Sequence, residues 1–198
     1  MDAAQAAEIA RAARLLADGR VVCYPTETHY GLGANALDPA AVARVVSAKG
    51  RAVGAPIAVI VPDLAAACRL WASLPAPLEA LARRYWPGPL TIVAPAKAGV
   101  PSPLVGELGV GARVSSNPVA HALAVAFGGP ITATSANVTG APPADTAAAA
   151  RAQLGEAVDA YLDGGPTPGG LPSTVIAIDP SGSPRVLRAG ALSIDFSP

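Results

Sequence analysis

The segment that most constrains the fold spans residues 21–33, VVCYPTETHYGLG. It begins as an apolar, β-type run, meets Pro25, and then opens into threonine hydroxyls, a carboxylate and two glycines. A strand that breaks into such a loop places polar side chains and bare backbone at the rim of a sheet, where a small molecule can bind. We therefore predict a strand followed by a ligand-binding loop.

The length and composition predict one domain. A chain of 198 residues buries roughly 70% of its unfolded surface on folding. Because 52% of the residues are hydrophobic and only 4% aromatic, we expect a core built from Ala, Val, Leu and Ile. We therefore predict a single domain over residues 1–198.

The charge pattern argues against several function classes. The formal net charge is zero, so no global field recruits nucleic acid or an anionic membrane, and any basic site must be local. Asp2, Glu8, Arg11 and Arg14 interrupt the N-terminal region, unlike a signal peptide. No window approaches the ~18 apolar residues of a membrane span. We expect a soluble, cytoplasmic protein with no membrane partner.

The two cysteines lack metal-ligand spacing. Cys23 falls in a predicted strand and Cys68 in a predicted helix. We predict that both are buried free thiols in a reducing compartment.

Periodicity and capping signals define the remaining elements. Helices are predicted at 4–18, 39–48, from 63, 75–85, 118–127 and 146–154. Strands are predicted at 57–61, 90–94, 110–114, 130–134, 158–162, 173–178 and 185–187, with loops at 95–109 and 163–172. Because strands and helices alternate, but several strands are closely spaced, we predict an α/β fold with a mixed sheet.

Familiar catalytic motifs are missing or poorly placed. Residues 31–36 scan as G-x-G-x-x-A, but the next helix begins only after Asp38, too late for a dinucleotide fold. There is no P-loop and no G-x-S-x-G elbow. His29 and His121, with two separated cysteines, make neither a catalytic triad nor a zinc site. We expect no protein nucleophile.

Cations and hydroxyls at the ends of elements remain as candidates. Lys49 and Arg51 flank Gly50 and could grip a polyphosphate, or could only complement a helix dipole. Ser135 and Asn137 offer hydroxyl and amide contacts at a strand end, or only turn chemistry. Within a strand, the charge of Arg113 needs solvent or an anion. Arg188 comes at the end of the last predicted strand, and it could be only a charge on the surface.

The segments PTET, KGR, WPGPLT, TSAN and STV occur in that order. This combination resembles the YrdC-like family of threonylcarbamoyl-AMP synthases over about residues 21–190. The resemblance implies a single compact domain, with a twisted mixed β-sheet and surrounding helices about a concave, locally basic active-site cleft. We expect the short form, without a further C-terminal domain.

The family reaction converts L-threonine, bicarbonate and ATP into threonylcarbamoyl-AMP and pyrophosphate. The product supplies the downstream machinery that forms threonylcarbamoyladenosine in tRNA. A carbamate oxygen attacks the α-phosphate, so the protein must supply positioning and charge neutralisation more than a nucleophile. The residue pattern suits this nucleotidyltransferase chemistry.

The resemblance also implies roles for individual residues. Lys49 and Arg51 are the predicted catalytic cations. The predicted ATP contacts are Lys49, Arg51, Ser135, Asn137 and Arg188, and the predicted threonine contacts are Thr28, Arg113 and Ser173. Mg²⁺ is expected to arrive with ATP, and no residue is assigned as a metal ligand because the sequence shows no carboxylate cluster.

Five positions depart from the family pattern. His29 and Gly109 occupy places where many members have a small or apolar residue and a hydroxyl residue, respectively. Ser115-Ser116 replaces a common proline-containing pair, and Ile60 stands where many members have a histidine. One hypothesis is that His29 supplies the imidazole missing at position 60.

Two other functions stay open. The first is a related enzyme that forms carbamoyl-adenylate for carbamoyl transfer. The second is a non-enzymatic RNA-binding module, or weak RNA binding beside the synthase activity, although the zero net charge and few aromatic residues argue against it.

Overall fold

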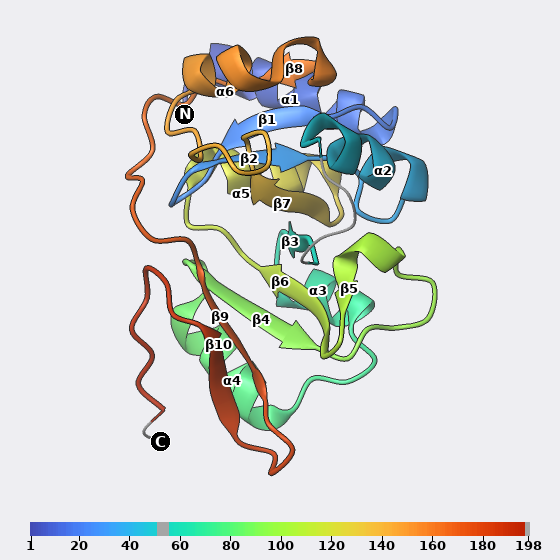
Figure 1. The fold of residues 1–198 in the computed structure, drawn as a ribbon, viewed down its shortest axis with the longest axis vertical. Coiled ribbons are helices and arrows are strands. Elements are labelled where there is room, and N and C mark those ends of the chain that lie inside the picture. Colours follow the sequence, from blue (N-terminus) through green and yellow to red (C-terminus); the bar gives the residue numbers. More distant parts are fainter. Residues whose placement is uncertain (51–55, 197–198) are drawn as a thin grey trace.

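A computed structural model describes residues 1–50 and 56–196, which build a mixed β-sheet flanked by helices (Figure 1). The strand order is β10-β9-β4-β6-β3-β7-β2-β1-β8, and β5 pairs with β6. The pairs β1/β8, β3/β6 and β4/β9 are parallel, whereas the other pairs are antiparallel. The predicted α/β fold with a mixed sheet is therefore confirmed.

The strands agree with the predicted positions to within a few residues, apart from the opening segment and β5. Their bounds are Val22–Pro25 (β1), Tyr30–Gly33 (β2), Ala58–Ile60 (β3), Leu90–Ala94 (β4), Val105–Gly106 (β5), Gly109–Arg113 (β6), Ile131–Ser135 (β7), Ala160–Tyr161 (β8), Thr174–Ile178 (β9) and Pro184–Arg188 (β10).

All the α-helices except α4 begin after a residue whose side chain caps the first turn. Their bounds are Ala3–Ala17 (α1), Pro39–Ala48 (α2), Leu64–Leu70 (α3), Ala76–Tyr85 (α4), Pro118–Phe127 (α5) and Ala147–Leu154 (α6), with short 3₁₀ turns at Ser102–Leu104 and Gly155–Ala157. The side chains of Asp38, Asn117 and Thr146 accept hydrogen bonds from the first turns of α2, α5 and α6. Gly128 ends α5 with a φ of 76°.

The opening segment is a hairpin, so the prediction of one strand followed by a loop is wrong in part. Strand β1 pairs with β2 from Val22 opposite Gly33 to Pro25 opposite Tyr30. Gly33 makes this pairing possible, because a Cβ there would lie 2.7 Å from a ring carbon of Tyr24. The loop is therefore confined to residues 26–29, and both of its ends are fixed by the sheet.

The predicted loop at 95–109 contains more order than expected. It includes a 3₁₀ turn and strand β5, which pairs with β6 through Val105 and Val110. Gly109, the first residue of β6, has a φ of 117°, and a Cβ there would lie 2.0 Å from the carbonyl oxygen of Ala94. This backbone geometry explains why a glycine occupies position 109.

Two apolar clusters hold the helices to the sheet. One cluster joins α1 and α5 to strand β1 through residues such as Leu16, Tyr24 and Leu123. The larger one contains Leu32, Val45 and Trp71. In Figure 1, α1, α5 and α6 surround the β1–β2–β7 end of the sheet, whereas α3 and α4 lie beside β6 and β4. In the strand order, β3 lies between these two groups of strands.

Cysteine burial is confirmed for one thiol and wrong for the other. Cys23 is fully buried in β1, but Cys68 is exposed on α3. Helix α3 buries the face that contains Ala66, Ala67 and Leu70, and Cys68 lies outside this face. The sequence alone does not indicate which face of so short a helix is buried. No helix in the described part of the chain is long and apolar enough to cross a membrane.

The two thiols are expected to differ sharply in reactivity. Burial raises the pKa of Cys23 to about 12, so this group stays a protonated, inaccessible thiol at pH 8. An aromatic disulfide reagent should therefore label one thiol of the native protein quickly and the second only after denaturation. A Cys68→Ser variant should lose the fast phase, and a fast phase that persists in this variant would contradict the burial of Cys23.

Candidate active site

A pocket of about 370 Å³ lies at the middle of the sheet. Seven of the eight predicted site residues line it: Thr28, Lys49, Arg113, Ser135, Asn137, Ser173 and Arg188. The eighth, Arg51, lies outside the described residues. Residues as far apart in the chain as Thr26 and Arg188 therefore line one cavity.

Lys49 forms the base of one end of the pocket. The residue is 4% exposed at the C-cap of α2. Its ammonium group donates to the carbonyl oxygens of Ser135 and Asn137, the latter at 3.0 Å, and lies 3.4 Å from the Asn137 side-chain oxygen. Lys49 therefore reaches the loop after β7 and does more than complement the dipole of its own helix.

Asn137 stabilises the loop that receives Lys49. Its side-chain nitrogen donates to the carbonyl oxygens of Val138 and Ala141, at 2.9 and 2.7 Å. The amide of Thr139 in turn donates to the carbonyl oxygen of Lys49 at 2.9 Å. The TSAN segment and the end of α2 thus form one hydrogen-bonded unit, with hydroxyl, amide and ammonium groups side by side.

Residues 26–29 form a tight turn that orients Thr28 at another part of the pocket. The hydroxyl of Thr26 donates to the carbonyl oxygen of His29 at 2.6 Å and lies 3.2 Å from the hydroxyl of Thr28. Thr28 is 7% exposed and lines the cavity. Thr26 also lines it but was not among the predicted site residues; its place inside PTET was the available signal.

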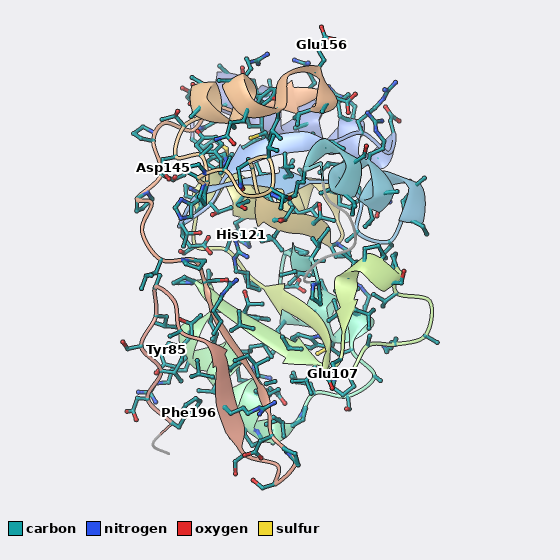
Figure 2. The ribbon with its side chains drawn as sticks, viewed as in Figure 1. Tyr85, Glu107, His121, Asp145, Glu156 and Phe196 are labelled. Atoms are coloured by element: carbon teal, nitrogen blue, oxygen red, sulfur yellow. The ribbon has the colours of Figure 1, made fainter. Side chains whose placement is uncertain are left out.

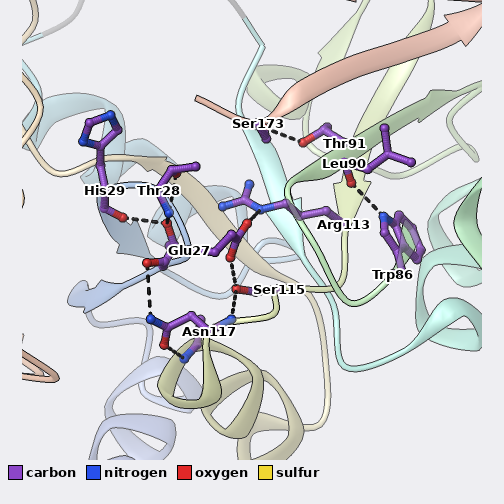
Figure 3. Close-up of polar contacts among 12 residues, drawn as sticks. Glu27, Thr28, His29, Trp86, Leu90, Thr91, Arg113, Ser115, Asn117 and Ser173 are labelled. Atoms are coloured by element: carbon purple, nitrogen blue, oxygen red, sulfur yellow. Dashed lines mark hydrogen bonds and ion pairs between the residues drawn. The ribbon is translucent and has the colours of Figure 1, made fainter. Parts of the chain in front are cut away.

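Arg113 lies in a buried ion pair (Figure 3). Its Nε donates to a carboxylate oxygen of Glu27 at 2.8 Å, and the two side chains are 7% and 9% exposed. The hydroxyl of Ser115 donates to the other carboxylate oxygen. The anion expected beside Arg113 is therefore the protein's own Glu27, a residue missed as a site residue despite its place in PTET.

Ser115 gives a structural meaning to one of the departures from the family pattern. Its oxygen also accepts the backbone N–H of Asn117 at 3.2 Å, and the Asn117 side chain donates to the carbonyl oxygen of Thr26. The Ser115 hydroxyl thus joins the start of α5 to the Glu27 carboxylate and helps to fix the 26–29 turn.

Ser173 and Arg188 adjoin the threonine-contact side of the pocket. The hydroxyl groups of Ser173 and Thr91 are 2.9 Å apart, which brings the STV and WPGPLT segments together (Figure 3). Arg188 donates to the carbonyl oxygen of Ser173 at 2.8 Å. Partial burial, and then the positive charge of Arg113, lowers the pKa of Arg188. Arg188 therefore lies beside the predicted threonine contacts Arg113 and Ser173.

His29 lines the pocket, but Ile60 does not. The His29 ring lies 2.7 Å from a carboxylate oxygen of Asp145 and 3.0 Å from the carbonyl oxygen of Gly170. Ile60 is fully buried in the apolar cluster formed with α1 and α5. The hypothesis that His29 replaces an imidazole at position 60 stays a prediction, and both ring nitrogens already face protein oxygens.

The pocket combines cations with neutral hydrogen-bonding groups. The cations are Lys49, Arg113 and Arg188, and the amide is that of Asn137. The hydroxyl groups belong to Thr26, Thr28, Thr134, Ser135, Thr139 and Ser173. Within residues 1–50 and 56–196, no group of three or more His, Cys, Asp or Glu side chains is placed to hold a metal ion. The lining suits a ligand that carries several negative charges and polar groups.

Comparison with known proteins identifies the class to which this fold and pocket belong. The Sua5_yciO_yrdC family model, described as "Telomere recombination", matches residues 14–190. The chain belongs to this family. The YrdC-like resemblance seen in the sequence is therefore confirmed.

Two curated relatives of the chain are threonylcarbamoyl-AMP synthases. The chain is 38% identical over 185 residues to the threonylcarbamoyl-AMP synthase of Pyrococcus abyssi, covering 93% of this chain and 54% of the relative. It is 41% identical to the threonylcarbamoyl-AMP synthase of Alkalilimnicola ehrlichii, covering 90% and 93%. The chain thus spans about half the length of the first relative but most of the second.

Among solved structures, the crystal structure of P. abyssi Sua5 complexed with L-threonine superimposes with a TM-score of 0.89 and 37% identity. The match covers 94% of this chain and 55% of that one. This likeness shows that the present chain has the same fold as the corresponding part of the threonine-bound relative.

Proposed function

We propose that this protein is an L-threonylcarbamoyladenylate synthase. It would convert L-threonine, bicarbonate and ATP into threonylcarbamoyl-AMP, pyrophosphate and water. The observation that carries the proposal is the single pocket in which Lys49 and the TSAN loop face the same cavity as Thr28, Arg113 and Ser173. Such a pocket can hold a polyphosphate and an amino acid at the same time.

In this proposal, Arg113 binds the carboxylate of L-threonine. Its Nε is committed to Glu27, and Figure 3 shows the guanidinium group projecting between Thr28 and Ser173. An arginine oriented by a buried carboxylate matches a substrate carboxylate well, because its donors form a fixed planar fork. The hydroxyls of Thr28 and Ser173 would bind the remaining polar atoms of the amino acid.

Lys49, Arg51, Ser135 and Asn137 would hold the triphosphate and the adenylate, with Arg188 completing the positive charge. Threonine's amine and bicarbonate first form a carbamate. A carbamate oxygen then attacks the α-phosphorus in line, a P–O bond forms, and the bond to the β-phosphate oxygen breaks to release pyrophosphate. Lys49 and Arg51 would act catalytically by neutralising charge as it moves onto the leaving group.

We further propose that Mg²⁺ enters with ATP. The described residues that line the pocket offer hydroxyl, amide and cationic groups and include no carboxylate, so this donor set fits a metal ion that is held mainly by phosphate oxygens and water. The proposal includes a cytoplasmic location and delivery of the product to the tRNA threonylcarbamoyl-transfer machinery.

Pyrophosphate release by the purified protein tests the proposal. Release that requires ATP, L-threonine and bicarbonate together is the expected result, and each substrate is omitted in turn. Turnover with carbamoyl phosphate in place of threonine and bicarbonate would instead indicate the related carbamoyl-adenylate enzyme. No turnover, together with salt-sensitive RNA binding, would indicate the RNA-binding module.

A further inference from the structure

The side chain of His29 faces two hydrogen-bond acceptors. Its Nδ1 lies 2.7 Å from a carboxylate oxygen of Asp145, and its Nε2 lies 3.0 Å from the carbonyl oxygen of Gly170. The His29 side chain is 15% exposed, whereas that of Asp145 is 53% exposed. The ring therefore joins three chain segments that are distant in sequence: the 26–29 turn, the segment that precedes the N-cap of α6, and the loop before β9.

The carbonyl oxygen of Gly170 fixes the role of one ring nitrogen. A backbone carbonyl only accepts, so Nε2 must carry a hydrogen. A second hydrogen bond joins Nδ1 to the Asp145 carboxylate at 2.7 Å. Both ring nitrogens of His29 are thus engaged with oxygen atoms of other chain segments.

The loop before β9 is fastened to the same turn by backbone contacts. We call residues 163–172 the glycine strap. The amide of Gly169 donates to the carbonyl oxygen of Thr28 at 2.8 Å, next to the bond between His29 and Gly170. Gly169 and Gly170 have φ values of 68° and 81°, and a Cβ on Gly169 would lie 3.2 Å from the Asp145 carboxylate. The strap follows this path because glycine permits it.

The strap leads directly into the pocket. Its last residue, Pro172, lines the cavity, and the next residue is Ser173. Tyr30 fastens the other end of the strap, since its hydroxyl donates to the carbonyl oxygen of Gly165 at 2.7 Å. His29 is therefore placed to fix the separation between the Thr28 and Ser173 hydroxyls, although its ring nitrogens are turned to protein oxygens.

We propose that His29 is a positioning residue for the amino-acid substrate: with Asp145, it holds the glycine strap against the Thr28 turn and thereby keeps Thr28 and Ser173 at the spacing that threonine requires. The kinetic part of this proposal rests on the synthase function. The structural part, the attachment of the strap, does not.

Three variants test the hydrogen-bonded pair of His29 and Asp145. His29→Ala and Asp145→Ala each remove one partner. Asp145→Asn keeps both bonds available to a neutral ring, because its amide can donate to Nδ1 while Nε2–H donates to Gly170. Glu156→Ala, which removes an exposed carboxylate far from Asp145 at the end of the fold (Figure 2), is the matched control.

Hydrogen exchange measures the strap without any need for activity. In His29→Ala and Asp145→Ala, amides of the strap should exchange roughly five- to thirtyfold faster, which is the effect of losing one or two hydrogen bonds. Asp145→Asn and the control should stay near the wild-type rate. Unchanged exchange in both alanine variants would overturn the proposal. Because Asp145 is exposed, Asp145→Ala should fold even if His29→Ala does not, and its exchange rates then decide the test.

Steady-state kinetics then separates positioning from catalysis. The alanine variants should raise the KM for L-threonine, with little change in kcat or in the KM for ATP, and the double alanine variant should be no worse than either single variant. A loss of kcat at unchanged threonine KM would overturn the positioning role. If the wild-type protein shows no synthase activity, the proposed function fails, and the exchange rates alone decide whether His29 holds the strap.

Discussion

Replacing Arg113 with glutamine is expected to raise the KM for L-threonine by roughly a hundredfold, because truncating one partner of a buried charge pair typically costs about 2–5 kcal/mol. The KM for ATP should change far less, since Lys49 and the TSAN loop stay intact. Threonine binding by calorimetry and steady-state kinetics would measure the effect. An unchanged threonine KM would contradict the assignment of Arg113 to the substrate carboxylate.

The same substitution should also destabilise the fold, for a separate reason. Arg113→Gln leaves the buried Glu27 carboxylate without its cation, at a cost of about 3 kcal/mol in the free energy of unfolding. Adding Glu27→Gln removes the uncompensated charge, so the double variant should recover much of the stability. It should not recover threonine binding. Denaturant titration beside the kinetics distinguishes these effects, and recovery of the threonine KM in the double variant would count against a direct contact.

Replacing Lys49 with methionine is expected to lower kcat/KM for ATP by roughly a hundred- to a thousandfold. This is the usual scale for removing one preorganised group that stabilises developing charge. The side-chain stem keeps its volume, while the ammonium group that contacts Ser135 and Asn137 is lost.

Lys97→Met provides the matched control for that variant. Lys97 is the other lysine of the chain, and its ammonium group also donates to a backbone carbonyl, that of Cys68, at 3.1 Å. Lys97 does not line the pocket, so its variant should retain wild-type kinetics. Similar losses in the two variants would show that the effect comes from stability or net charge rather than from a role of Lys49 in the pocket.

Local signals in the sequence predicted much of the fold. The helices predicted at 39–48, 118–127 and 146–154 begin within one residue of the expected positions, where Asp38, Asn117 and Thr146 cap them, and Gly128 ends α5. These features depend on contacts within one turn, so a short window of sequence contains the necessary information. The mixed sheet followed from the order and spacing of the same elements.

Features that depend on distant contacts could not be predicted in the same way. The β1–β2 hairpin requires Gly33 to accommodate the Tyr24 ring, and the exposure of Cys68 depends on which face of α3 meets the sheet. Both outcomes are decided by packing, which overrides the local pattern. The short strand β5 exists only because it pairs with β6.

The candidate site shows the same division. Motif order indicated the residues that converge on the pocket, and seven of them do so. It did not indicate that Glu27 pairs with Arg113, or that His29 meets Asp145 and Gly170, because these partners are 86, 116 and 141 residues apart. Such contacts form only when the sheet brings β6, the 26–29 turn and the glycine strap together.

The most direct measurement of the central claim is the mass of the product formed from ATP, L-threonine and ¹³C-labelled bicarbonate. If one pocket joins all three substrates, mass spectrometry should detect threonylcarbamoyl-AMP that contains the labelled carbon, and Arg113→Gln and Lys49→Met should each abolish or strongly reduce it. Pyrophosphate formed without a labelled adenylate that contains threonine would contradict the account.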